Sequence, residues 1–181
     1  MSVQKSGGRR THSSNFPGVP PFAIRVFGDP VLKQRCAEVT EFDGALRKLA
    51  DDMLETMYDA PGVGLAANQV GIQKRLFVYD VGEGPGAIVN PVIHEVSGEW
   101  TYDEGCLSVP GLYWPIVRAA HVRLTGQDLD GAPIQIEADE LMGRMLQHEV
   151  DHLEGKLLLT RLTDEQRKEA MRTLRENPPR R

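Results

Sequence analysis

The segment His148-Glu149-Val150-Asp151-His152 places two histidines four residues apart, with a glutamate beside the first. On an α-helix, residues four apart lie one turn apart on the same face, so both imidazoles can reach a single ion. Glu149 stands where a carboxylate can take a proton from metal-bound water. The pattern predicts a metal-binding helix over about residues 138–154.

The helical phase of this segment predicts which side faces the core. At about 100° per residue, four residues fall within one narrow stripe: Leu141, Met145, His148 and His152. Glu149 extends the same side, and a buried carboxylate between two inward histidines is costly to keep without an ion. The opposite side is predicted to hold mainly polar residues, namely Glu140, Arg144, Gln147, Val150, Asp151 and Glu154.

A catalytic metal site also needs a third protein ligand and an open position for water. The position at which a metzincin has its third histidine is Leu158 here. A thermolysin-like enzyme would use a downstream glutamate, and three are available: Glu165, Glu169 and Glu176. Upstream, Cys106 offers a thiolate, although a single cysteine is more often a small buried hydrophobe. The residues alone leave these choices open.

Hydrophobic spacing predicts the remaining elements. Apolar residues three and four apart predict a helix over residues 41–58, and Thr163 with Gln166 fits a capping box at the start of a third helix. Candidate strands cover residues 75–80, 87–94, 115–125 and 133–137, with a hairpin signal at Asp130-Gly131. Strands grouped between helices predict an α+β fold, with mainly antiparallel sheets around the HExxH-bearing helix and an additional C-terminal helix.

Composition narrows the class of protein. A net charge of −5 from 26 acids and 21 bases argues against direct nucleic-acid binding through a broad basic surface. Two cysteines suit a cytoplasmic protein, and no run approaches the roughly 18 apolar residues of a membrane span. Residues 1–21 are basic, acid-free and rich in glycine, serine and proline, which predicts a disordered N-terminal extension better than an organelle transit peptide. Residues 22–181 are predicted to form a single catalytic domain.

The segment 62–69, GVGLAANQ, formally matches a dinucleotide-binding fingerprint, but that motif must follow a strand and open a helix. This segment follows a predicted helix and leads into a strand, so the order is wrong. Its glycines are predicted to let the backbone come close to another group, with Gln69 offering an amide donor.

Three segments in order, GVGLAANQ at 62–69, EGCLS at 104–108 and QHEVDHLEG at 147–155, resemble the signature motifs of peptide deformylases. The similarity extends over about residues 24–162. The resemblance implies a Cys106, His148 and His152 ligand set for one Fe²⁺ ion, with Ni²⁺, Co²⁺ or Zn²⁺ able to substitute. It also implies that metal-bound water attacks the formyl carbon of an N-terminal formylmethionine, releasing formate, with Glu149 as general base and acid.

The same resemblance assigns the remaining site residues. Gln69 and the Leu107 backbone N–H would stabilise the oxyanion, and the backbone at Val63 and Gly64 would pair with the peptide. The expected partners are N-formylmethionyl nascent polypeptides near the ribosome, in the cytoplasm and without a membrane. Two competing hypotheses are a zincin-type endopeptidase, which predicts a glutamate third ligand, and a non-catalytic metal-stabilised binding domain, which predicts four protein ligands.

Overall fold

A five-stranded antiparallel sheet and a two-stranded hairpin form the framework of the protein in a computed structural model, which describes Met1 and residues 20–178. The larger sheet has the order β1-β2-β3-β6-β7, and its strands are β1 (Gly64–Ala66), β2 (Leu76–Tyr79), β3 (Gly86–Ser97), β6 (His121–Gln127) and β7 (Pro133–Asp139). The hairpin pairs β4 (Trp100–Cys106) with β5 (Val109–Arg118). The fold is α+β, as predicted.

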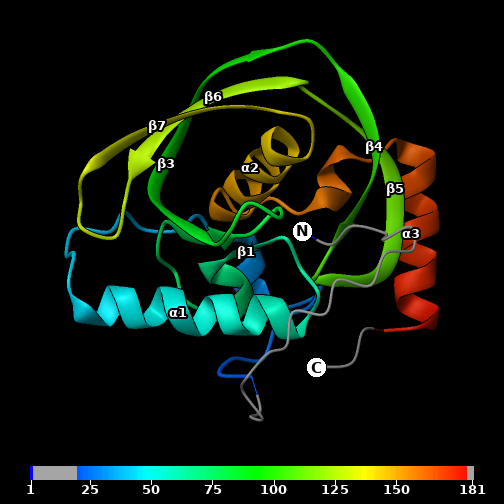
Figure 1. Ribbon diagram of the computed structural model, residues 1–181. Coiled ribbons are helices and arrows are strands. Elements are labelled where there is room, and N and C mark those ends of the chain that lie inside the picture. The colour runs from blue at the N-terminus through cyan, green and yellow to red at the C-terminus, as the bar shows by residue number, and fades with distance from the viewer. Residues whose placement is uncertain (2–19, 179–181) are drawn as a thin grey trace.

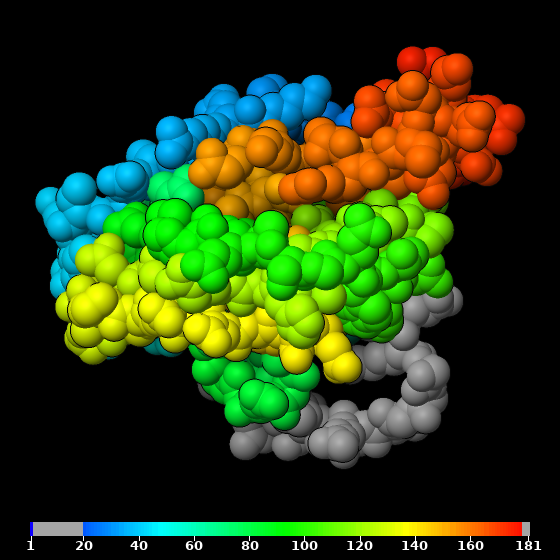
Figure 2. Space-filling view, turned by 90° about the horizontal axis from the view of Figure 1, so that it is seen from above, coloured from blue at the N-terminus to red at the C-terminus, as the bar shows by residue number. Residues whose placement is uncertain are grey.

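In the part of the chain that the structure describes, three α-helices pack on this framework: α1 (Gly44–Asp59), α2 (Glu140–Leu153) and α3 (Asp164–Glu176). Three short 3₁₀ helices cover Pro30–Lys33 (η1), Ala67–Val70 (η2) and Leu158–Arg161 (η3). Figure 1 shows α2 at the centre, under the arch of β3, β6 and β7, with α1 on the far side of β1 and α3 beside β4 and β5. In Figure 2, α3 lies at one end of the molecule.

Burial of one apolar face holds α2 in this central position. Met145, Leu146 and Leu153 of α2 belong to a buried cluster with residues of the sheet. The helix ends at Leu153, and Gly155 follows with a φ of +70°, the left-handed conformation that commonly stops a helix. A Cβ at Gly155 would come within 2.7 Å of the Lys33 carbonyl, so the chain after α2 passes too close to η1 for a larger residue.

The predicted helix boundaries are close to those observed. The first helix begins at Gly44 rather than near residue 41, because the Asp43 side chain accepts a hydrogen bond from Leu46 N and caps the helix. The predicted capping box of the third helix is confirmed: Thr163 Oγ1 accepts from Gln166 N, and Gln166 Oε1 accepts from Thr163 N.

The prediction of one strand over residues 115–125 was wrong. The chain leaves the β4-β5 hairpin after Arg118 and joins the larger sheet at His121, so this segment contributes to two different strands. The Gln147 side chain of α2 satisfies the backbone at the break: its amide donates to Ala119 O at 3.0 Å and accepts from Ala119 N at 3.2 Å. The strands β1 and β4 were not predicted.

The predicted hairpin between β6 and β7 is confirmed. Asp128 Oδ1 accepts from Asp130 N at 2.8 Å and from Ala132 N at 2.9 Å, and Gly131 adopts a φ of +83°. The side chain of Asp128 therefore organises the turn, while glycine supplies the left-handed residue that it requires.

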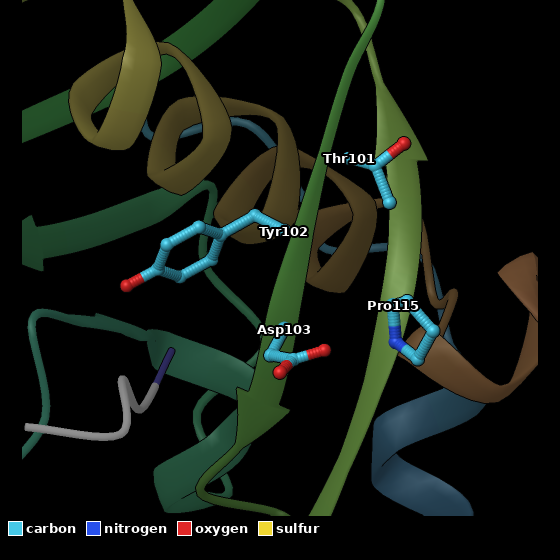
Figure 3. A pocket seen from close by; sticks show the side chains of 4 residues that line it. All are labelled: Thr101, Tyr102, Asp103 and Pro115. Carbon is cyan, nitrogen blue, oxygen red and sulfur yellow. The ribbon is translucent and has the colours of Figure 1, made fainter.

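The β4-β5 hairpin carries a surface pocket of about 330 Å³ lined by Thr101, Tyr102, Asp103 and Pro115 (Figure 3). Tyr102 extends to one side of β4, whereas Thr101 and Asp103 lie on the other, as the alternation of a strand requires. Within the described ranges, no helix combines the length and apolar character needed to cross a membrane. The predicted extension over residues 1–21 falls largely on residues 2–19, which lie outside the described part of the chain.

Candidate active site

The predicted ligand residues Cys106, His148 and His152 come together at the centre of the molecule. Cys106 is the last residue of β4, and the two histidines lie one turn apart on α2. All three are buried, and their candidate ligand atoms lie within 4.8 Å of one another. Cys106 Sγ and His148 Nε2 are each 3.2 Å from His152 Nε2. One small volume is therefore faced by a sulfur and two ring nitrogens.

This donor set fits a transition-metal ion. Tetrahedral coordination with usual bond lengths separates two imidazole nitrogens by about 3.3 Å, and a nitrogen from a thiolate sulfur by about 3.6 Å. The observed N–N separation of 3.2 Å is close to the first value, and the S–N separation of 3.2 Å is about 0.4 Å shorter than the second. Thiolate and imidazole ligands suit iron, nickel, cobalt and zinc better than magnesium or calcium.

The pKa shifts of the two histidines also bear on metal binding. Burial and the neighbouring His148 lower the pKa of His152 well below its usual range, so this ring is neutral and keeps a lone pair for a metal. Burial and the Met1 ammonium group lower the pKa of His148, but hydrogen bonds to Cys106 and Glu104 raise it more, to about 9. Glu104 and Cys106 therefore favour a positive charge at the His148 ring, whereas the His152 ring stays neutral.

Glu104 orients His148 from behind. Its Oε1 is 2.6 Å from His148 Nδ1, which leaves Nε2 directed at the ligand cluster. Glu104 is fully buried, and its carboxylate also accepts bonds from Arg118 at 2.7 and 2.8 Å. Burial alone would raise the pKa of Glu104, but the bonds from Arg118 and His148 outweigh it and hold that pKa well below its usual range. Glu104 is therefore an anion.

Glu104 was not predicted as a site residue, although the sequence contained a signal for it. Residues two apart on a strand share a face, so a side chain two positions before Cys106 on β4 points toward the same helix. Glu104, the acidic residue of EGCLS, was therefore expected on the same face of the strand as Cys106, where it can contact the helix that carries the histidines.

The predicted exposure of Arg144 was wrong. Arg144 is fully buried; its Nη1 donates to Glu104 Oε2 at 2.7 Å, and its guanidinium lies 4.9 Å from the Trp100 ring centroid. Arg144 precedes His148 by four residues, so the two share a helix face, and the helical phase that placed Arg144 on the polar side was wrong. Asp151 is also buried rather than solvated, because it pairs with Arg118 and Arg161 at 2.9 and 2.7 Å.

Glu149 faces the loop that carries the first glycine-rich motif. It is fully buried, and within the described residues its Oε2 has no hydrogen-bond partner. A Cβ at Gly64 would lie 2.5 Å from Glu149 Oε1 and 3.0 Å from Met145 Cγ. Gly64 therefore allows β1 to come close to α2, as the sequence predicted of these glycines.

Gln69 brings the same loop beside the cysteine motif. Its Oε1 accepts from Ala66 N at 2.9 Å, which fixes the side chain. Its amide nitrogen then donates to Ser108 Oγ at 3.0 Å and lies 3.9 Å from Cys106 Sγ. Leu107 follows Cys106 directly, and a Cβ at Gly62 would meet its Cδ1 at 2.8 Å. The predicted site residues of all three motifs are thus neighbours.

The first residue of the chain also lies in this site. The Met1 ammonium donates to Gly64 O at 2.6 Å and to Glu149 Oε1 at 2.9 Å, while Met1 O accepts from Val63 N at 2.9 Å. The Met1 side chain is fully buried in the cluster that includes Met145. Figure 1 marks the N-terminus in the region between β1 and α2. Sequence patterns gave no signal for this contact.

The alternative third ligands lie elsewhere. Glu165, Glu169 and Glu176 are exposed residues of α3, which packs beside β4 and β5. Among the described residues, the group of metal-ligating side chains consists of Cys106, His148 and His152. A glutamate from α3 therefore does not complete a thermolysin-like site.

The arrangement matches a known family. A family model described as polypeptide deformylase matches residues 21–168. The chain belongs to the polypeptide deformylase family. It is similar to a peptide deformylase of Acidothermus cellulolyticus, with 50% identity over 153 residues, covering 84% of this chain and 85% of that protein. Peptide deformylase 1 of Corynebacterium efficiens is 49% identical over 157 residues, which cover 84% of this chain and 93% of the relative.

Solved structures agree with this assignment. A peptide deformylase from Legionella pneumophila superposes with a TM-score of 0.82 at 42% identity, covering 86% of this chain and 94% of that one. A Synechococcus elongatus peptide deformylase in complex with actinonin gives a TM-score of 0.82 at 39% identity, with 87% and 88% covered. The chain is therefore a metal-dependent hydrolase that removes the formyl group from new polypeptides beginning with formylmethionine.

Proposed function

We propose that Cys106, His148 and His152 hold one Fe²⁺ ion, for which Ni²⁺, Co²⁺ or Zn²⁺ can substitute. The buried thiol and two imidazoles converge within 4.8 Å, and Glu104 fixes the ring of one histidine, which supports this set. When bound, the metal supplies Lewis acidity, which makes water acidic near neutral pH and polarises the formyl carbonyl.

Glu149 is the general base and acid in this proposal. The observation that carries it is the 2.9 Å contact between Glu149 Oε1 and the Met1 nitrogen, the atom equivalent to the amine that deformylation releases. A carboxylate at this distance can accept a proton from the attacking water and pass it to the leaving nitrogen. Burial keeps solvent from exchanging with that proton, because Glu149 is fully enclosed.

Two groups beside the cysteine motif stabilise the developing oxyanion. The Gln69 amide is fixed through its own oxygen and points toward Cys106 and Ser108, so its donor is oriented before substrate arrives. The backbone N–H of Leu107 is the second donor. Each preorganised donor of this kind typically contributes about 10²–10³-fold in rate.

Backbone groups of β1 and the residue before it hold the peptide. Val63 N and Gly64 O already bond to the carbonyl and the nitrogen of a methionine, and these are groups that every N-terminal methionine possesses. Recognition through the main chain at a sheet edge suits nascent chains of varied sequence. We further propose that the protein acts in the cytoplasm, close to the ribosome, where such chains emerge.

Formate release from formyl-Met-Ala-Ser by anaerobically prepared, iron-loaded protein tests the function. Gln69→Glu keeps the side-chain size but removes the donor, and it should lower kcat by about 10²-fold or more. Gln34→Glu, the same change at an exposed position, is the matched control and should leave kcat unchanged. Cleavage of internal peptide bonds without formate release would instead support an endopeptidase.

A further inference from the structure

The substrate position of this site is filled by the chain's own N-terminus. Both polar backbone groups of the bound residue have partners: the Met1 ammonium donates to Gly64 O and Glu149 Oε1, and Met1 O accepts from Val63 N. The side chain has no exposed surface. A contact that buries an apolar side chain and satisfies its backbone groups has the features of a bound ligand rather than of a chance surface contact.

The charge of the occupant is specific to the state after deformylation. The Met1 ammonium and the Glu149 carboxylate form an ion pair at 2.9 Å, with both groups fully buried. A formylated nitrogen is neutral and cannot form this pair. The free amine of a methionine can, because pairing offsets part of the cost of burying each charge. The occupied site therefore resembles an enzyme with its product retained.

The covalent connection of Met1 to the rest of the chain favours its binding in the active site. Residues 2–19 join Met1 covalently to the described body of the protein, so Met1 is a ligand attached to the molecule that carries its site. A ligand tethered to its own site has an effective concentration on the order of millimolar. An N-terminal methionine that binds with only millimolar affinity in free solution would then occupy about half of the molecules.

We propose that the N-terminal methionine of this chain, carrying a free amine, binds intramolecularly in the active site and competes with formylated substrates. The proposal rests on the deformylase function of the site and adds a regulatory occupant to it. Any substrate must displace Met1 before it reaches Glu149, so the contact raises the apparent KM and leaves kcat unchanged.

Two variants of the full chain test the proposal when their first residue is defined by protease cleavage. Met1→Gly keeps an N-terminal amine but removes the buried side chain, and a chain with one glycine added before Met1 keeps the side chain but converts the amine to an amide. With iron-loaded enzyme and formyl-Met-Ala-Ser, each variant should show an apparent KM at least two-fold lower at equal kcat. The same KM in all three proteins would overturn the proposal.

A second measurement needs no turnover. The N-terminal amine of the native chain should react with an amine-directed acylating reagent at least two-fold more slowly than that of the Met1→Gly chain, as followed by mass spectrometry. Protection that grows with protein concentration would assign the contact to a second copy and overturn the intramolecular form. Equal rates for the two amines would overturn the occupancy itself, whatever the result of the activity assay for the proposed function.

Discussion

The carboxylate of Glu104 lies 2.6 Å from Nδ1 of His148, on the side of the ring opposite the ligand cluster. This contact fixes the rotation of the imidazole and leaves Nε2 as the ligand atom, the usual role of a carboxylate behind a metal-binding histidine. Arg118 and Arg144 hold Glu104 in turn, so one buried anion connects β4, β5 and α2 at the site.

Glu104→Gln should weaken metal binding by about 10–100-fold, because a neutral amide orients the histidine but no longer increases its basicity. Competition with a chelator of known affinity measures the change. Glu95→Gln is the control, since Glu95 is exposed and its ion pair within the described residues is with Arg123. Equal metal affinity for Glu104→Gln and the parent protein would contradict this role.

Arg144→Met should lower the free energy of unfolding by about 3 kcal/mol, because it removes one partner of a fully buried ion pair. Glu104 retains Arg118, which places the loss at the lower end of the usual range. Urea denaturation of the metal-free protein gives the value. Arg123→Met, at an exposed pair, should cost less than about 1 kcal/mol. An equal loss of unfolding free energy in the two variants would show that the buried pair stabilises the protein no more than the exposed pair.

The sequence predicted the features that depend on local periodicity. The positions of α2 and α3, the capping box at Thr163 and the β6-β7 turn follow from residues a few positions apart, whose interactions form within one element. The strand β4 was missed because its acids and glycine disfavour a strand when considered alone. Its stability comes from pairing with β5, a tertiary interaction.

The site residues likewise divide into those that local spacing predicts and those that depend on tertiary contacts. Motif spacing was sufficient to nominate His148, Glu149 and His152, whereas Cys106 was assigned as a ligand by the family resemblance. The structure brings Cys106 and the two histidines together. The burial of Arg144 was not predicted, because it depends on Glu104 from β4 and on the Trp100 ring. The contact between Met1 and Glu149 joins positions 148 residues apart, and no local pattern encodes such a separation.

Cys106→Ala should abolish stoichiometric metal binding and activity, since it removes one of three converging ligands. Cys36→Ala is the matched control: Cys36 is also buried, but burial raises the pKa of its thiol to about 11, so it stays protonated. Metal content by elemental analysis distinguishes the two variants. Full metal content in Cys106→Ala, with a glutamate of α3 proving essential, would refute the proposed ligand set.

The iron-loaded enzyme should lose activity in air, whereas the nickel-loaded enzyme should keep it. A thiolate next to a redox-active ion is exposed to oxidation toward sulfenic and sulfinic acids. Formate release is followed over time in aerated and anaerobic buffer, and mass spectrometry of the peptide containing Cys106 reports added oxygen. Equal lifetimes of the iron and nickel forms in air would argue against iron as the working metal.

Glu149→Ala should distinguish a general base from a metal ligand. Glu149 follows His148 directly but is turned by about 100° around the helix, and its Oε1 meets the Met1 nitrogen rather than the ligand cluster. The variant should therefore retain one metal ion per chain, while turnover falls by about 10²-fold or more, the usual contribution of a positioned acid–base group. Metal content and formate release are measured on the same preparation. Loss of metal together with activity would make Glu149 a structural residue, and near-normal turnover would mean that another group transfers the proton.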